Sequence, residues 1–277
     1  MPKVSVIMAV YNMEKNVRIL KKAVASVINQ TYQDWELIIC DDGSTDHTLQ
    51  ILRHISSKDE RLHMISCSQN HGAGYARNMC MRAARGKYLA VMDADDISKP
   101  QRLEKQVRFL DSYPQYALVG CNAGMMDSCG VWGVRILKER PDKMDFLRTL
   151  PFVHPSIMIR KEVAFKLHGY TQAMTARRAE DYEFLMRLYA AGYRGCNIQE
   201  PLILYREDMQ SYRKRTYRSR LDECRVRCQG FLKLGILKGN FRYVLKPIIV
   251  GMVPAGMMRH IKIRRYGGSI GGNDDRY

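Results

Sequence analysis

Polar and glycine-rich clusters follow four consecutive apolar segments of the chain. They are Tyr11-Asn12, Asp41-Asp42-Gly43-Ser44, His71-Gly72-Ala73-Gly74 and Asp93-Ala94-Asp95-Asp96. If the apolar segments are parallel strands, their carboxyl ends lie at one edge of a sheet, which is where ligands bind in open α/β folds. A single acidic turn is usually only solvated, but four clusters in register predict one binding crevice.

The Asp93-x-Asp95 pair is the sharpest of these features. Two carboxylates at i and i+2 in a crevice are hard to ionise together without a counterion. Carboxylate oxygens suit Mg²⁺ or Mn²⁺, and such an ion stabilises a departing diphosphate. We therefore predict a divalent-cation site made by Asp93, Asp95 and Asp96. His154 is a further candidate ligand for the metal or the diphosphate, although a lone histidine is more often structural.

The sequence Gly72-x-Gly74-x-x-Arg77 partly matches the dinucleotide-binding fingerprint. Arg77 replaces the third glycine, and the motif follows the third predicted strand instead of the first, so a dinucleotide-binding oxidoreductase is disfavoured. We interpret the glycines as a place where the backbone turns close to a ligand. Arg77 then points inward or contacts a phosphate.

Strands alternate with helices over the first 120 residues, which predicts an α/β fold with a mainly parallel, doubly wound sheet. Beyond Gly124 this rhythm changes. The predicted strands are Val4–Val10, Trp35–Cys40, Leu62–Ser66, Tyr88–Met92, Ala117–Cys121, Val131–Leu137, Phe152–Arg160 and Leu202–Tyr205. The predicted helices are Asn16–Asn29, Asp46–Ile55, Gly74–Ala84, one that Ser98 caps, Lys161–Leu167, Ala179–Ala191 and Arg213–Leu237.

Taken together, the motifs resemble a family 2 glycosyltransferase of GT-A fold. The resemblance extends over roughly residues 3–206, because His154–Arg160 and Glu180–Glu183 also match. It implies a catalytic domain over residues 1–210, with a nucleotide-sugar-binding half (1–120) and an acceptor half (121–210). Residues 211–277 form a basic helical extension with a glycine-rich tail.

The resemblance also implies roles for single residues. The donor is a nucleotide diphosphate sugar, usually UDP-linked, and transfer inverts the anomeric carbon. Ala9 and Tyr11 lie along the base, Asp41 and Asp42 hold base and ribose with Asp42 preferred for uracil, and Asp93-Ala94-Asp95-Asp96 is the DxD motif, with Asp95 preferred for Mn²⁺ or Mg²⁺. Asp181 matches the catalytic base. Taken without the resemblance, an acid there is a common helix-starting residue.

The chain carries a formal charge of +17, and its last quarter holds most of the excess. Arg206–Tyr266 contains 16 Lys and Arg against 4 acidic residues. The uncharged stretch Pro247–Met258 is too short to span a bilayer, and basic residues flank it. We expect a cytoplasmic enzyme without a secretory signal, peripheral on the inner face of a bacterial membrane and acting on a lipid-linked or saccharide acceptor.

Two other interpretations remain open at this point. One is another sugar-nucleotide or phosphosugar enzyme that uses the same crevice. The other is a basic module for nucleic acid or membrane, or a catalytically inactive homologue. A nucleic-acid partner is not expected, because the strand-end motifs are acidic and few aromatic residues alternate with arginine.

Overall fold

A computed structural model describes residues 1–173, 176, 178–208 and 216–267. The strands are β1 (Val4–Val10), β2 (Trp35–Asp41), β3 (Leu62–Ser66), β4 (Tyr88–Asp93), β5 (Ile97–Ser98), β6 (Leu118–Asp127), β7 (Gly130–Arg135), β8 (Met158–Arg160) and β9 (Gly195–Arg206). The α-helices are α1 (Val17–Ile28), α2 (Thr48–Ser56), α3 (Ala73–Ala83), α4 (Arg102–Ser112), α5 (Lys161–Lys166), α6 (Glu180–Ala190), α8 (Tyr217–Lys233), α9 (Lys246–Gly251) and α10 (Ala255–Tyr266). Short 3₁₀ turns are η1 (Glu14–Asn16), η2 (Lys143–Leu147), η3 (His154–Ser156) and η5 (Phe241–Tyr243).

All described strands belong to one nine-stranded sheet, in the order β3-β2-β1-β4-β8-β6-β9-β5, with β7 added to β6. The pairs β3-β2, β2-β1, β1-β4 and β6-β9 are parallel. Because β8 is antiparallel to both β4 and β6, the strands β4 and β6 run in the same direction. The carboxyl ends of β1, β2 and β4 therefore lie together, as the sequence predicts.

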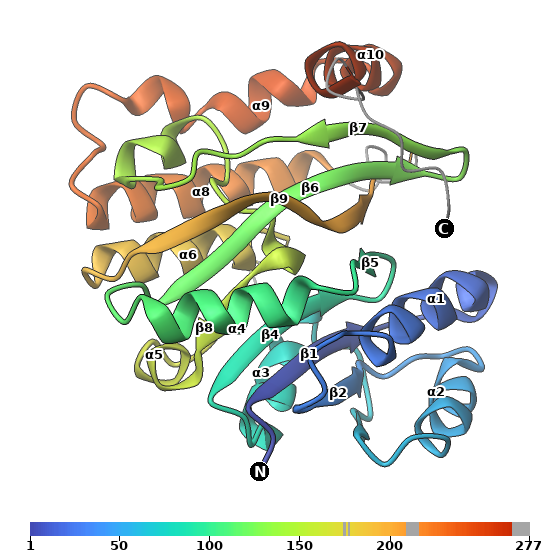
Figure 1. Cartoon of the computed structure of the whole chain (residues 1–277). Coiled ribbons are helices and arrows are strands. Elements are labelled where there is room, and N and C mark those ends of the chain that lie inside the picture. The colour runs from blue at the N-terminus through green and yellow to red at the C-terminus, as the bar shows by residue number, and fades with distance from the viewer. Residues whose placement is uncertain (174–175, 177, 209–215, 268–277) are drawn as a thin grey trace.

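Alternating side chains of the central strands face two helical layers. Ile7 and Ile38 pack with residues of α3, α5, α6 and α8, whereas Val6 and Leu37 pack with residues of α1, α2 and α4. This period of two is the one that a strand buried on both faces requires. Figure 1 shows the sheet between these layers. The result is a mixed α/β sheet with a helical C-terminal region.

Two local predictions were wrong. Phe152–Arg160 is not one strand, because it contains η3 and only Met158–Arg160 pairs in the sheet. Pro155 explains the difference, since proline has no N–H for a central ladder. Ser98 does not cap α4. It lies in β5, and its hydroxyl accepts a hydrogen bond from Gln30 Nε2 at 3.2 Å.

The C-terminal helices share the core of the sheet. Cys224 and Phe231 of α8 are buried in the cluster that also contains Ile7 and Leu89. In Figure 1, α9 and α10 lie above β7, and Gly133 of β7 packs so closely on α10 that a Cβ atom would be 2.9 Å from the Tyr266 carbonyl oxygen. The predicted helix start at Arg213 and most of the glycine-rich tail lie outside the described residues.

No single helix in the described part of the chain is long and apolar enough to cross a membrane. The segments Phe241–Gly251 and Gly256–Tyr266 reach that length and composition only as a pair, and the pair is bent by 118°.

Candidate active site

The two aspartates after β2 have different surroundings. Asp42 uses both carboxylate oxygens to hold the next loop, accepting from the amides of His71 at 3.0 Å and Gly72 at 2.7 Å. Asp41 Oδ2 accepts from the Ser44 amide at 3.2 Å, whereas its buried Oδ1 has no hydrogen-bond partner among the described residues. An unsatisfied buried acceptor is costly. The geometry therefore favours Asp41 over our preferred Asp42 for a donor group of a bound base.

The end of β1 is hydrogen-bonded to the loop that follows β2. Ala9 lies between Cys40 of β2 and Asp93 of β4 in the sheet register and is partly buried. Asn12, with φ +49°, donates its amide to Ser44 Oγ at 2.9 Å. Tyr11 is 44% exposed. Its side chain is therefore accessible to a ligand at this edge of the sheet.

Arg77 connects the end of β4 with the start of α6. Its guanidinium donates to Asp93 Oδ1 at 2.7 Å and to Glu180 Oε1 at 3.4 Å. Arg77 is buried, and although burial alone would lower its pKa, the charges of Asp93, Tyr170 and Glu180 raise it. For Asp93, burial alone would raise the pKa, but the charge of Arg77 holds the pKa below its usual range. Both groups are therefore charged at neutral pH.

The acidic turn after β4 is held by Arg206, the last residue of β9. Asp96 is buried and accepts the Arg206 amide at 2.7 Å through Oδ1, while Arg206 Nε donates to the Asp95 carbonyl at 3.1 Å. Asp96 Oδ2 has no hydrogen-bond partner in the described residues. Burial, then the charges of Asp95 and Asp93, raise the pKa of Asp96 well above its usual value. Ala94 is buried and Asp95 exposed.

A cation at this turn fits the donor set only in part. No three His, Cys, Asp or Glu side chains among the described residues meet in an arrangement that would hold a metal ion by themselves. Magnesium-type ions, however, are commonly bound by one or two carboxylates together with substrate phosphates. Asp95 is exposed, and the next residue, Asp96, has a carboxylate oxygen without a hydrogen-bond partner among the described residues. These carboxylates suit an ion that a diphosphate helps to bind.

His154 lies deeper than a sequence prediction could tell. Its Nε2 and the Tyr170 hydroxyl are 2.9 Å apart. Burial, followed by the nearby charge of Arg77, lowers the pKa of His154 to about 3, against an opposing effect of Asp93. His154 is thus a neutral imidazole beside the Arg77–Asp93 pair. Its Nε2 is engaged by Tyr170, so a direct metal contact through that atom requires Tyr170 to give way.

Asp181 lies in the first turn of α6, after Glu180 and before Glu183. Its side chain is partly exposed, and Oδ1 accepts the Tyr182 amide at 2.7 Å. Burial raises the pKa of the Tyr170 hydroxyl, and the charges that act on it include Arg77, Asp93 and Asp181. Tyr170 is therefore a common neighbour of the end of β4 and the start of α6. The predicted base and Asp93 therefore act on the same tyrosine.

Three residues of this site were missed in the sequence. Tyr170 contacts His154, and Arg206 holds the acidic turn. Asn78 holds the backbone of Tyr170 by two hydrogen bonds: its Nδ2 donates to the Tyr170 carbonyl at 2.7 Å, and its Oδ1 accepts from the Tyr170 amide at 2.8 Å. Asn78 directly follows Arg77, so its place next to a candidate site residue could have identified it from the sequence. Tyr170 and Arg206 lie outside any local motif.

Comparison with known proteins identifies the family. The glycosyl transferase family 2 profile matches residues 5–183. This chain belongs to glycosyl transferase family 2. The putative glycosyltransferase EpsE of Bacillus subtilis is 37% identical over 265 residues, which is 95% of this chain and 94% of EpsE. The protein is therefore a glycosyltransferase. A second relative, the UDP-Glc:alpha-D-GlcNAc-diphosphoundecaprenol beta-1,3-glucosyltransferase WfgD of Escherichia coli, is 29% identical over 54% of this chain and 65% of its own.

Solved structures share the fold at lower identity. Staphylococcus aureus TarS 1–349 in complex with UDP-GlcNAc aligns with a TM-score of 0.66 and 19% identity, covering 90% of this chain and 71% of that one. The mannosyltransferase PcManGT of Pyrobaculum calidifontis, in complex with GDP-Man and Mn²⁺, aligns with a TM-score of 0.61 and 20% identity, covering 95% and 80%. These likenesses show that the family 2 glycosyltransferase has the GT-A fold.

Proposed function

We propose that this glycosyltransferase moves a sugar, with inversion, from a UDP-sugar to a hydroxyl of a lipid-linked or polysaccharide precursor of the bacterial cell surface. The observation that carries the proposal is the Arg77 bridge. It joins Asp93, at the strand end where a donor diphosphate would lie, to Glu180, beside the acid that would take the acceptor's proton. Binding and catalytic groups are thereby held in one frame.

The donor half of the proposal rests on Asp41 and the loop that Asp42 shapes. A buried carboxylate oxygen without a partner suits an N–H donor such as the imide of uracil. Gly72, at φ +99°, opens the loop before α3, so that the backbone can approach a ligand closely. The complexes of TarS with UDP-GlcNAc and of PcManGT with GDP-Man support a nucleotide-sugar donor for this fold.

In the proposed reaction Asp181 removes the proton of the acceptor hydroxyl. The acceptor oxygen forms a bond to the anomeric carbon from one side as the bond to the donor's diphosphate oxygen breaks on the other, so configuration inverts. The proton ends on the Asp181 carboxylate and the bonding electrons leave with the diphosphate. A bound Mn²⁺ or Mg²⁺, held by Asp95 with Asp93 or Asp96, would neutralise charge on that leaving group.

The test is a donor panel with one variant and one control. Asp181→Asn keeps the shape of the side chain but removes the base, so turnover should fall roughly 10²–10⁴-fold while donor binding is nearly unchanged. Glu183→Gln is the control, since it lies in the same turn but pairs with Arg187 at 2.8 Å. If Asp181→Asn lost donor binding, Asp181 would contact the nucleotide-sugar donor and would not be the base. Wild type without turnover of any UDP- or GDP-sugar would favour an inactive homologue.

Docking of the enzyme on an anionic membrane is part of the same proposal. Exposed apolar side chains gather on η5, α9 and α10, namely Phe241, Leu245, Ile249, Met252, Met257 and Ile261. Basic residues are interspersed with them, and near an anionic surface each contributes about 1 kcal/mol. Two of these cations instead hold α10 on the sheet, through the ion pairs Arg259–Asp127 and Lys262–Glu207. Such docking would give the enzyme a peripheral place on the inner leaflet and access to a lipid-linked acceptor; the name of WfgD includes a diphosphoundecaprenol acceptor.

Co-sedimentation with vesicles tests the docking. Full-length Ile249→Glu and Met252→Glu should lose binding to vesicles that contain anionic lipid, because both side chains are exposed on this surface. Phe165→Glu on α5 is the control, since it is also exposed but belongs to another helix. Binding of the wild type should fall with salt. Equal binding by all variants, or none by the wild type at low salt, would contradict the docking.

A further inference from the structure

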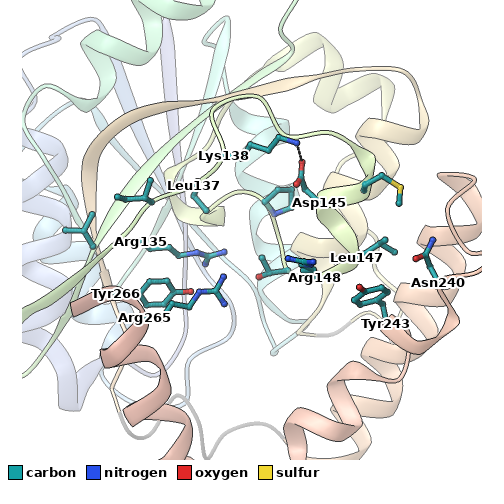
Figure 2. A pocket seen from close by; sticks show the side chains of 15 residues that line it. Arg135, Leu137, Lys138, Asp145, Leu147, Arg148, Asn240, Tyr243, Arg265 and Tyr266 are labelled. Atoms are coloured by element: carbon teal, nitrogen blue, oxygen red, sulfur yellow. Dashed lines mark hydrogen bonds and ion pairs between the residues drawn. The ribbon is translucent and has the colours of Figure 1, made fainter. Parts of the chain in front are cut away.

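A cavity of about 630 Å³ lies away from the strand-end site, between η2, the end of β7 and the C-terminal helices. That volume is in the range of small-ligand pockets. It is lined on one side by Arg135 of β7, with Lys138 just after it, and on the other by Arg148 after η2. The C-terminal part contributes Tyr243, Arg265 and Tyr266. Figure 2 shows Arg135 and Arg265 extending into the same space as Arg148.

The charges around this cavity are unbalanced. Among the described residues that line it, Asp145 is the only acid, and it is already paired with Lys138 at 2.9 Å. Arg135 donates to the Leu150 carbonyl at 2.9 Å, which fixes its position without neutralising it. Arg148 and Arg265 are exposed. Three guanidinium groups thus face one cavity with a single, engaged carboxylate.

The cavity arginines contribute to the pKa shifts of two neighbouring groups. Burial first, then the charges of Arg227 and Arg265, lower the pKa of Lys246, whose ammonium donates to the Arg148 carbonyl. Arg242 and then Arg148 lower the pKa of the Tyr243 hydroxyl. Guanidinium forks match the oxygens of a phosphate, and two aromatic hydroxyls beside them are further donors. This chemistry fits a phosphate or diphosphate group.

The position of the cavity points to a lipid as the source of that group. Two of its walls, Tyr243 and Tyr266, belong to the segments that carry the exposed apolar side chains Ile249 and Ile261. A ligand whose phosphate lies between the arginines would therefore be held by the same two segments that carry these exposed apolar side chains. Basic pockets next to membrane-facing helices are a common form of lipid headgroup site.

We propose that this cavity binds the phosphate or diphosphate headgroup of a membrane lipid. The lipid assignment rests on the membrane docking proposed above, but the phosphate site itself requires no sugar transfer. Bound there, a headgroup would fix the orientation of the enzyme on the bilayer in addition to its mere attachment.

The test compares neighbouring arginines in the full-length protein. Arg148→Gln and Arg265→Gln remove cavity cations, and Arg264→Gln is the matched control, because it is exposed on the same helix but does not line the cavity. Titration with inorganic pyrophosphate measures binding at the phosphate site. EDTA is present so that no divalent metal ion can bind pyrophosphate at the strand-end site. We expect about tenfold weaker binding in each cavity variant and little change in the control, since one charge-assisted hydrogen bond is lost.

A second arm uses vesicles of phosphatidylcholine with phosphatidic acid. Arg265→Gln should bind them about tenfold more weakly than Arg264→Gln. Equal losses in both variants would mean that only diffuse surface charge is sensed, which overturns the lipid assignment. Pyrophosphate binding that no cavity variant weakens overturns the phosphate site. Wild type that binds pyrophosphate but no vesicles would overturn both the docking and the lipid assignment, and would leave a free phosphate compound as the ligand.

Discussion

Replacing Arg77 by methionine should destabilise the protein more than any exposed ion pair would. Methionine keeps much of the apolar stem but leaves Asp93 and Glu180 facing each other without a cation. The two contacts, at 2.7 and 3.4 Å, correspond to gross attractions of about 6 and 5 kcal/mol at an effective dielectric constant of 20. Removing Arg77 also relieves its own desolvation, so we expect a net loss of about 3–5 kcal/mol.

Urea unfolding of the wild type and Arg77→Met gives this difference directly. Arg225→Met is the control, because the Arg225–Asp222 pair spans 3.0 Å with Arg225 66% exposed, and exposed pairs contribute about 0–1 kcal/mol. The double variant Arg77→Met/Asp93→Asn should recover part of the loss, since it removes one uncompensated carboxylate. A loss below about 1 kcal/mol in Arg77→Met would refute the bridge as a structural link.

The same variant has a pH signature. In the wild type, Arg77 lowers the pKa of Asp93, so this carboxylate contributes stability that is present above its unfolded pKa and is lost as pH falls through the lower folded value. Without Arg77, burial raises the pKa of Asp93, and protonation relieves the cost as pH falls. The difference between the two proteins should therefore shrink from pH 7 towards pH 4.

Three further outcomes are expected. His154 should make unfolding pH-dependent, because its pKa falls from 6.5 to about 3 on folding. Stability is therefore lost as pH falls between these two values, by up to about 1.4 kcal/mol per pH unit. Urea unfolding of His154→Gln at a series of pH values should lack this slope. Gly169→Ala should lower thermal stability by about 2–3 kcal/mol, because φ is +64° and a Cβ would lie 2.4 Å from Asn78 Oδ1, whereas Gly192→Ala, with φ +86° and open space, should cost only about 1 kcal/mol. Asp95→Ala and EDTA should each abolish sugar transfer, and full turnover in EDTA would remove the metal from the mechanism.

The first half of the fold was predictable because its strands are continuous apolar runs. The predicted bounds of β1 and β3 agree with the structure, and β2 and β4 each extend one residue further, to Asp41 and Asp93. Burial on both faces leaves few competing structures for such runs. The second half carries less local information. β9 was predicted only from Leu202, because Pro201 lies in its middle, where the register with β6 shifts.

The strand-end positions of the site were predictable, but its pairings were not. A motif places Asp41, Asp42 and Asp93 at the right edge, because that follows from topology alone. The hydrogen-bond partner of each side chain is distant in sequence. Asp42 accepts from the amide of His71, and Arg77 binds Glu180, which is 103 residues away. The pKa values of Asp96 and His154 likewise depend on burial that no spacing encodes.

Helix α3 explains how one short element can hold both halves of the predicted site. Its consecutive residues Arg77 and Asn78 contact two segments from the second half of the chain: Arg77 binds Glu180 at the start of α6, and Asn78 binds both backbone groups of Tyr170. Arg77 also binds Asp93 at the end of β4. The end of β4, Tyr170 and the start of α6 are therefore all connected through two consecutive residues of α3.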